Sequence, residues 1–381
     1  MRTRPTGSSI ISASHDDLSR HVYGFFGMPI DADDRVSVLQ KIIAAAEAEK
    51  PFLISTPNVN FLAESQRDSQ FRETLLQSDH CCADGMPLVW ISRLLGIPIK
   101  QRVSGSDLFE TVRGDFSSAR PLKVFLFGGG EGAAETVCCL LNNRPSGIRC
   151  VGWLNPGFGT IEEMSGAGIF ERINSSEADM LAVFLSAKKA QFWLHQNHRR
   201  LRVPVRGQFG ATINYQAGVL RRAPTTLQRL GFEWLWRIKE EPYLWRRYWS
   251  DGLLLARLVI TRALPIAIGL AWYRLGKEDE REALSLWSRH DNGLAVIGLV
   301  GYASKRHVVK AIAVFRSLLP ERCDVSIDMS ETRAIDHRFF GLLLMLRKEL
   351  KKEGKNLRFR GVSTRARRYF RLNGFEFLLE P

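Results

Sequence analysis

The sequence lacks the cysteine patterns that form the disulfides of small secreted domains or bind zinc. Its six cysteines include two adjacent pairs and form no CxxC spacing. Neither a disulfide framework nor a zinc site is therefore expected, and a reducing cytoplasm fits the composition best.

Signals for export and for membrane insertion are also missing. Residues 1–21 are polar and lack the apolar core of a signal peptide, so we expect a disordered tail that stays in the cytoplasm. In the apolar segment 252–276 the longest uncharged run has 11 residues, whereas a membrane-spanning helix needs about 20. The segment could still lie in a membrane surface.

Acidic residues are outnumbered by basic ones. The 381 residues include 54 Lys and Arg against 40 Asp and Glu, a net charge of +14. This excess indicates an acidic partner, which can be nucleic acid, anionic lipid or a phosphorylated substrate. With 45% hydrophobic and 25% charged residues, the chain is expected to fold, and its length allows two domains.

In the first half of the chain, strand-like apolar runs alternate with helical patterns, which is typical of a parallel sheet covered by helices. The expected strands are 52–56, 123–129, 149–154 and 180–186, and the expected helices are 33–50, 106–116, 132–144 and 163–176. We therefore predict a Rossmann-like α/β domain over residues 22–220, with helices on both faces of its sheet.

The rest of the chain divides into three segments. Residues 221–276 form a basic, tryptophan-rich helical appendage, and residues 277–290 are charged and helical and are expected to be a linker. In residues 291–381 three strand patterns alternate with three helix patterns, which predicts a small independent β/α domain. The appendage is either a solvated helix pair or a surface for anionic lipid, and its apolar neighbour favours lipid over nucleic acid.

Three loops of the first domain follow strands closely: "STPNVNF" (55–61), "CADGMPL" (82–88) and "FGGGEGAAE" (127–135). Because ligands of open parallel sheets bind beyond the carboxyl ends of the strands, we expect these loops to converge on one crevice. Thr56 and Asn58 offer a hydroxyl and an amide. Asp84 offers a base, whose pKa its apolar surroundings would raise, or else a turn acid that bonds nearby N–H groups.

The glycine loop matches the loose G-x-G-x-x-G/A pattern of dinucleotide-binding folds at Gly128, Gly130 and Ala133. However, the next strand ends without the carboxylate that would hold a ribose hydroxyl, so no NAD cofactor is expected. Two interpretations are left, a diphosphate that meets the backbone N–H groups and a plain tight turn.

Helix capping explains two polar motifs. "DADD" (31–34) would fit a metal-binding D-x-D pattern, but it directly precedes a helical run, where Asp caps free N–H groups. "QRVSGSDLFE" (101–110) opens a helix with Ser106 or Asp107 as its cap, or else brings Arg102 to a phosphate. No other cluster of His, Cys and carboxylates suggests a catalytic metal.

Together these stretches resemble the WecG/TagA/CpsF glycosyltransferase family over about residues 22–250. The resemblance is carried by "TPNVNFL", "CADGMPLVW", "QRVSGSDLF", "VFLFGGGEGAAE", "VGWLNPGF" and the block "AGVLRRAPTTLQRLGFEWLWRIKEEPYLWRRYW". It implies inverting, metal-independent and cofactor-free transfer of an N-acetylmannosamine-type sugar from a UDP-sugar to a polyprenyl-diphosphate-linked sugar. Such a reaction takes place at the cytoplasmic face of the cell membrane and serves bacterial cell-surface or exopolysaccharide synthesis.

The resemblance also implies roles for single residues. Asp84 is the candidate catalytic base, with Thr56 beside it. The implied substrate-binding residues come from the loops and the appendage: Asn58, Gly85, Arg102, Gly105, Asp107, Gly128, Gly129, Gly130, Gln191, Asn214, Arg222, Arg237 and Arg246. The appendage arginines are expected to complete the site once this segment docks at an anionic membrane surface.

Two positions depart from the family pattern. Ala190 stands where the family usually has Gln, and Asn214 stands where it usually has Asp. These departures favour a rival interpretation, a catalytically degenerate membrane-bound scaffold, whereas Thr56, Asn58 and Asp84 favour an active enzyme.

Residues 291–381 resemble a STAS domain, through "VSIDMSETRAIDHRFFGLLLMLRKELKKEGKNLRFRGVS". The resemblance implies a docking or regulatory module for an unknown protein partner. Regulatory members carry a phosphorylatable Ser after the equivalent of Asp336. Here His337 and Arg338 occupy that loop, so a switch by serine phosphorylation is not expected.

Overall fold

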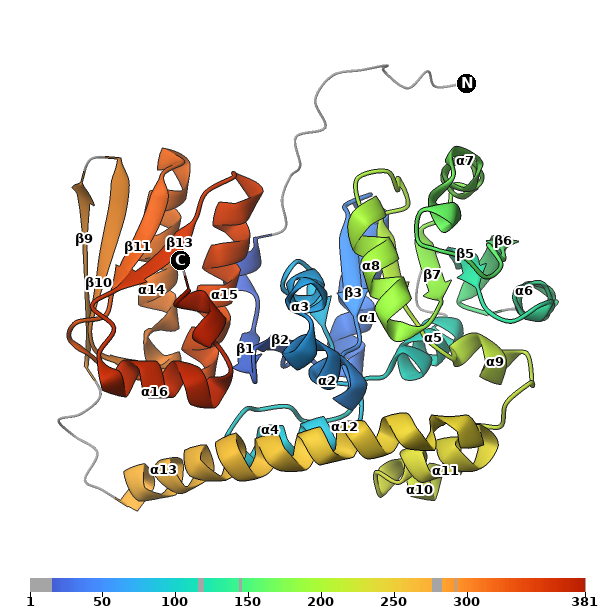
Figure 1. Ribbon diagram of the computed structural model, residues 1–381. Coiled ribbons are helices and arrows are strands. Elements are labelled where there is room, and N and C mark those ends of the chain that lie inside the picture. The colour runs from blue at the N-terminus through green and yellow to red at the C-terminus, as the bar shows by residue number, and fades with distance from the viewer. Residues whose placement is uncertain (1–15, 116–119, 144–145, 276–282, 292, 381) are drawn as a thin grey trace.

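The computed structural model describes residues 16–115, 120–143, 146–275, 283–291 and 293–380. It contains two α/β units that stand side by side above one long helix (Figure 1). The predicted fold class is confirmed, because a parallel sheet flanked by helices is followed by a helical appendage and a smaller β/α unit.

The first unit is built on a six-stranded sheet in which all strands are parallel. In spatial order the strands are β4 (His80–Cys81), β3 (Phe52–Ser55), β8 (Val205–Gln208), β7 (Met180–Phe184), β5 (Leu122–Gly128) and β6 (Ile148–Leu154). Strands β3, β5, β6 and β7 were predicted. Strands β4 and β8 were missed, because β4 has two residues and β8 reads VRGQ, without an apolar run.

Helices cover both faces of this sheet. They are α1 (Arg35–Glu47), α2 (Val59–Arg67), α3 (Ser69–Leu76), α4 (Met86–Leu94), α5 (Gly105–Gly114), α6 (Ala133–Asn142), α7 (Ala167–Ser175), α8 (Ala187–Asn197) and α9 (Thr212–Gln216). The alternation along β5 divides its side chains between two apolar cores, with Leu126 in one and Phe127 in the other. Phe127 stacks on Trp193 of α8, with ring centroids 4.4 Å apart.

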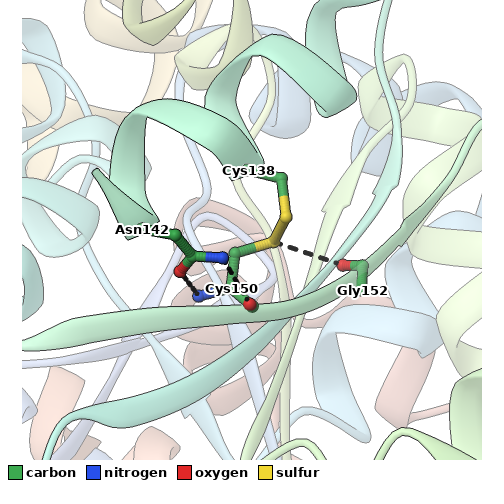
Figure 2. The surroundings of a disulfide bond; sticks show 4 residues. All are labelled: Cys138, Asn142, Cys150 and Gly152. Carbon is green, nitrogen blue, oxygen red and sulfur yellow. Dashed lines mark hydrogen bonds between the residues drawn. A yellow bond between two sulfur atoms is a disulfide. The ribbon is translucent and has the colours of Figure 1, made fainter.

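A disulfide joins Cys138 of α6 to Cys150 of β6 (Figure 2), which contradicts the expectation that the chain has none. The two Cα atoms are 5.2 Å apart, because α6 packs directly on β6. Asn142 ties the same elements together, since its side chain donates to the Cys150 carbonyl over 2.9 Å and accepts from the Cys150 N–H over 3.0 Å. The pairing depends on this packing, which cysteine spacing does not reveal.

The second unit has a five-stranded mixed sheet. Strand β10 (Leu294–Ala303) pairs antiparallel with β9 (Leu284–Asp291) and parallel with β11 (Asp324–Asp328) and β12 (Thr332–Ile335), and β13 (Leu357–Arg360) follows β11. Its helices are α14 (Val308–Leu318), α15 (His337–Lys352) and α16 (Thr364–Asn373). Short 3-10 turns are η2 (Glu163–Ser165), η3 (Pro242–Leu244), η5 (Lys305–His307), η6 (Leu319–Glu321) and η7 (Glu376–Leu378).

The predicted helical linker 277–290 is wrong over residues 284–290, which belong to β9. Leu284 and Leu286 alternate with polar or exposed neighbours and pack on the apolar core of the second unit. The charged run that precedes this alternation concealed it in the sequence. Residues 277–282 lie outside the described part of the chain.

The N-terminal segment connects the two units. The turn η1 (Asp17–Ser19) and the hairpin of β1 (Val22–Phe25) and β2 (Met28–Asp31) pack against α15 (Figure 1). The prediction of a tail is therefore wrong for residues 16–21, because Asp17, Leu18 and Arg20 are buried. Their charges read as a solvated tail in the sequence, but they are paired in the fold. Residues 1–15 lie outside the described residues.

The appendage begins with α10 (Thr225–Arg229) and α11 (Glu233–Glu240) and continues as one long helix. This helix comprises α12 (Trp245–Leu258), the π-helical turn η4 (Val259–Ala263) and α13 (Leu264–Leu275). The π turn ends two residues before Pro265, which has no backbone N–H for a regular helical bond. The stretch Pro242–Trp272 is long and apolar enough to cross a membrane by length and composition, so counting only the uncharged run underestimated it.

The docking of α15 leaves no room for a side chain at Gly341, where a Cβ atom would overlap the Val22 carbonyl of β1. We predict that Gly341→Ala destabilises the protein by about 1–3 kcal/mol, as overpacking does, in a thermal or urea denaturation experiment. Gly252→Ala is the matched control, because that helical glycine has open space around it and should become slightly more stable. Equal stability of the two variants would contradict close docking of α15 on β1.

Candidate functional site

Asp84 lies beyond the carboxyl end of β4, in the turn that leads into α4. Its backbone N–H donates to the Pro57 carbonyl over 2.8 Å, which ties the turn to the loop after β3. The carbonyl of Ala83 accepts the N–H of Val103 over 2.9 Å, which ties the turn to the segment before α5. Two of the three predicted loops therefore meet at this edge of the sheet, together with the "QRVSGSD" turn.

The Asp84 carboxylate is half-buried and accepts no hydrogen bond from any residue that the structure describes. The alternative of a turn acid bonded to nearby N–H groups is therefore not observed. Burial raises its pKa from 3.8 to about 8. Arg102 opposes the rise, and the negative charges of Glu233 and Asp107 add to it.

Two arginines meet at Asp107, beside Asp84. Arg102 lies 3.1 Å from one carboxylate oxygen of Asp107 and also pairs with Glu233 of α11, and Arg222 pairs with the other oxygen. Although burial disfavours the charge of Asp107, Arg102 and Arg222 hold its pKa below the ordinary value. The appendage thus supplies both an arginine and a carboxylate to the cluster.

The cap of α5 is Ser104 rather than the predicted Ser106 or Asp107. The hydroxyl of Ser104 accepts the N–H of Asp107 over 3.0 Å, and Asp107 accepts the N–H of Ser104, which makes a capping box. Gly105 lets this helix begin against β8, since a Cβ atom would lie 3.1 Å from Phe209 Cα. Asp107 therefore bonds to the cap and to both arginines, and its predicted contact with substrate stays a prediction.

The other predicted residues of these two loops lie in or next to the two segments that the hydrogen bond from Asp84 to Pro57 joins. Thr56 is buried directly after β3. Asn58 caps α2, because its side-chain oxygen accepts the N–H groups of Asn60 and Phe61 over 3.0 and 3.2 Å, so only its amide N–H groups could serve a ligand. Gly85 has φ +102°, which a glycine adopts readily, and precedes α4.

The glycine loop follows β5, which lies several strands along the sheet from β4 and therefore from Asp84. Strands β3, β8 and β7 lie between β4 and β5, which separates the two strand ends by about 19 Å at about 4.8 Å per strand. Gly128 packs closely on Phe184 and Gly129 on Ile213, so a Cβ atom at either position would be crowded, whereas Gly130 has open space. Local packing thus accounts for Gly128 and Gly129, as the tight-turn interpretation expects.

Three further predicted residues are not brought to Asp84. Gln191 is fully buried and its amide donates to Ser55 over 2.8 Å, so its polar groups bond within the core and its role in substrate binding stays a prediction. Arg237 donates to the Tyr215 hydroxyl over 2.6 Å. Arg246 is exposed on α12.

The positions that depart from the family pattern differ in exposure. Ala190 is fully buried in the core between the sheet and α8, whereas Asn214 is half-buried on α9. Sequence reasoning missed Glu233, the partner of Arg102, although it opens the "EWLWR" stretch. The available signal for Glu233 was its position as an acid at the start of a basic helix.

Three carboxylates of the "DADD" motif have structural partners within the protein. Asp34 caps α1, as predicted, while Asp31 pairs with Arg20 over 2.8 Å and Asp33 pairs with a lysine of α1. Together with His80, whose pKa burial lowers to about 4, Asp31 and Asp33 could present ligands to a metal ion. Both carboxylates are already neutralised by cations, which weakens this possibility. A second grouping in the second unit consists of His290, Glu321 and Cys323.

Comparison with known proteins identifies both units. The model of the glycosyl transferase WecG/TagA/CpsF family matches residues 23–267, and the model described as Mlab, STAS domain matches residues 291–380. The chain is similar to proteins named N-acetylglucosaminyldiphosphoundecaprenol N-acetyl-beta-D-mannosaminyltransferase. That of Bacillus spizizenii W23 is 26% identical over 205 residues, 54% of this chain and 77% of the relative. Those of Bacillus subtilis 168 and Staphylococcus aureus NCTC 8325 are each 23% identical, over 52% and 54% of this chain and 75% and 80% of the relatives.

Proposed function

Because the chain belongs to the WecG/TagA/CpsF family and is a glycosyltransferase, we propose that it transfers an N-acetylmannosamine-type sugar from a UDP-sugar to a polyprenyl-diphosphate-linked sugar. The names of the relatives support this acceptor class and this sugar. A UDP-sugar is the proposed donor, since its diphosphate makes a good leaving group. The product serves the synthesis of a bacterial cell-surface or exported polysaccharide.

Asp84 is the base in this proposal, and its free, partly buried carboxylate is the observation that carries the assignment. In an inverting transfer the acceptor hydroxyl attacks the anomeric carbon while the nucleoside diphosphate leaves from the opposite face. The hydroxyl must lose its proton as it attacks. A carboxylate with a pKa near 8 accepts a proton more readily than an ordinary aspartate does, and no hydrogen bond among the described residues competes for it.

Arg102 and Arg222 are the proposed contacts of the leaving diphosphate. Both guanidinium groups lie at Asp107, close enough to Asp84 to influence its pKa. A diphosphate offers more charge and more acceptor oxygens than Glu233 does, so it can displace Glu233 from Arg102. Two arginines then supply the positive charge that stabilises the departing group, and the proposal needs no metal ion.

We predict that Asp84→Asn lowers kcat for transfer by about 10²- to 10⁴-fold, the usual contribution of a general base. Binding of the UDP-sugar, measured by calorimetry, should persist because Asp84 does not hold the diphosphate. Asp34→Asn is the matched control, since asparagine caps a helix as well as aspartate does, and it should transfer normally.

Near-normal turnover by Asp84→Asn would refute the base assignment. If the unaltered protein binds a panel of UDP-sugars but transfers none to a short polyprenyl-diphosphate-sugar, the scaffold interpretation gains support instead.

For the location of this activity, we propose the inner face of the cell membrane, with the long helix lying along the surface. One side of this helix is exposed and apolar, through Trp245, Trp249, Leu253, Ile260, Leu264, Ile268 and Trp272. The other side is committed to the protein: Asp251 is 3% exposed and accepts a hydrogen bond from Asn60 of α2 over 3.0 Å. A helix held in this way supports a peripheral rather than a membrane-crossing arrangement.

Replacing two tryptophans of the exposed side should detach the protein from membranes. We predict that Trp249→Glu with Trp272→Glu weakens binding to vesicles that contain phosphatidylglycerol by roughly 10- to 100-fold, since each indole contributes apolar burial and each new charge opposes insertion. Phe158→Glu is the control, because Phe158 is fully exposed on the loop after β6. Equal binding by the double variant and the unaltered protein in a flotation assay would contradict the proposed surface.

A further inference from the structure

A buried ion network joins the second unit to the first. Lys348 of α15 has a side chain that is 3% exposed. Its ammonium group lies 2.7 Å from Asp79 and 3.1 Å from Asp17, and it donates to the Ser78 carbonyl over 3.1 Å. All three hydrogen bonds reach residues of the first unit or the N-terminal segment. Because water does not solvate this buried ammonium group, these three partners must compensate its charge.

The network continues from Asp17 into the first unit. Arg20 donates to Asp17 over 2.9 Å, to Asp31 over 2.8 Å and to the Ser78 carbonyl over 2.9 Å. Burial opposes the charges of Arg20 and Asp31. Their mutual attraction outweighs it, because the pKa of Arg20 is raised and that of Asp31 is lowered. Arg20 and Asp31 are therefore both charged throughout the neutral range.

The partners of this network belong to the segment that leads to the candidate base. Asp31 accepts the N–H of Cys81 over 2.7 Å, and the second oxygen of Asp79 accepts the N–H of Leu53 in β3 over 2.9 Å. Asp84 follows Cys81 by three residues. The carbonyl of Ser78 accepts hydrogen bonds from both Arg20 and Lys348. The two carboxylates that accept these N–H groups are thus linked to Lys348, Asp79 directly and Asp31 through Arg20 and Asp17.

We propose that the STAS-like domain takes the transferase domain of its own chain as its partner, and that Lys348 is a positioning residue for the turn that carries Asp84. Loss of Lys348 removes the cation that lies between Asp17 and Asp79. Asp17 keeps Arg20 and Lys352, but Asp79 loses its ion pair with Lys348, and compensating that buried charge requires the β4 segment to shift or admit water. A displacement of about 1 Å at a catalytic group can cost about 10²-fold in rate. The proposal rests on the proposed function only for the role of Asp84.

The test compares two lysines of α15 that cross the same interface. Lys348→Met keeps the length of the side chain and removes the charge. Lys351→Met is the control, because Lys351 pairs with Glu73 of α3 over 2.7 Å but is half-exposed and lies outside the network. Amide hydrogen exchange over residues 79–85 of the full-length protein and transfer kinetics are both measured.

For Lys348→Met we expect exchange at the Cys81 and Asp84 amides to accelerate at least tenfold, and kcat to fall by about 10²-fold with a smaller change in KM for the UDP-sugar. Lys348→Arg should restore slow exchange and most of the turnover. If Lys348→Met is too unstable to purify, Lys348→Gln, which keeps donors but loses the charge, is read in the same way.

Unchanged amide exchange over residues 79–85 in Lys348→Met and Lys348→Gln would overturn the proposal. An equal effect of Lys351→Met would overturn it as well, because it would show that the contact acts only by docking α15 and not through Lys348. The exchange measurement does not depend on transferase activity. Accelerated exchange in Lys348→Met therefore supports the coupling even if Asp84→Asn retains transfer, in which case only the assignment of the base fails.

Discussion

The fold depends on a few charges that are buried in pairs. Arg20 and Asp31, together with Asp17 and Lys348, link the N-terminal segment, the end of β4 and the second unit. Removing one member of such a network leaves an uncompensated buried charge, which is far more costly than losing an exposed pair. These ion pairs, together with Leu18, Val22 and Leu76 in the apolar core of the second unit, hold the two units against one another.

At the candidate site the Asp84 carboxylate, unlike the carboxylates of the buried network, is not directly paired with a cation of the described residues. Asp84 is partly buried beside Arg102 and Arg222, yet neither arginine is bonded to it, since Arg222 pairs with Asp107 and Arg102 pairs with Asp107 and Glu233. A carboxylate in this position carries the cost of burial without a direct ion pair, so its pKa is raised. The appendage, which brings Arg222 and Glu233, therefore helps to tune the proposed base as well as to hold the leaving group.

Sequence patterns predicted those parts of the fold that depend on local order. The apolar runs of β5, β6 and β7 identified the sheet, and the apolar neighbours of Asp84 suggested its raised pKa. Contacts between distant segments were missed. Asp17 and Arg20 read as a solvated tail because their partners come from α15 and β2, and the Cys138–Cys150 bridge depends on how α6 packs on β6. The burial of Gln191 could not be predicted for the same reason, since its partners lie in β3 and α3, far from it in the sequence.

The central claim is that burial turns Asp84 into a base with a pKa near 8. The most direct test is the pH dependence of kcat/KM for transfer, which reports the free enzyme. The carboxylate must be deprotonated to act, so kcat/KM should rise by about tenfold per pH unit below about pH 7 and level off above about pH 9. A profile that is flat from pH 6 to pH 9, as an ordinary aspartate with a pKa near 4 would give, would contradict it.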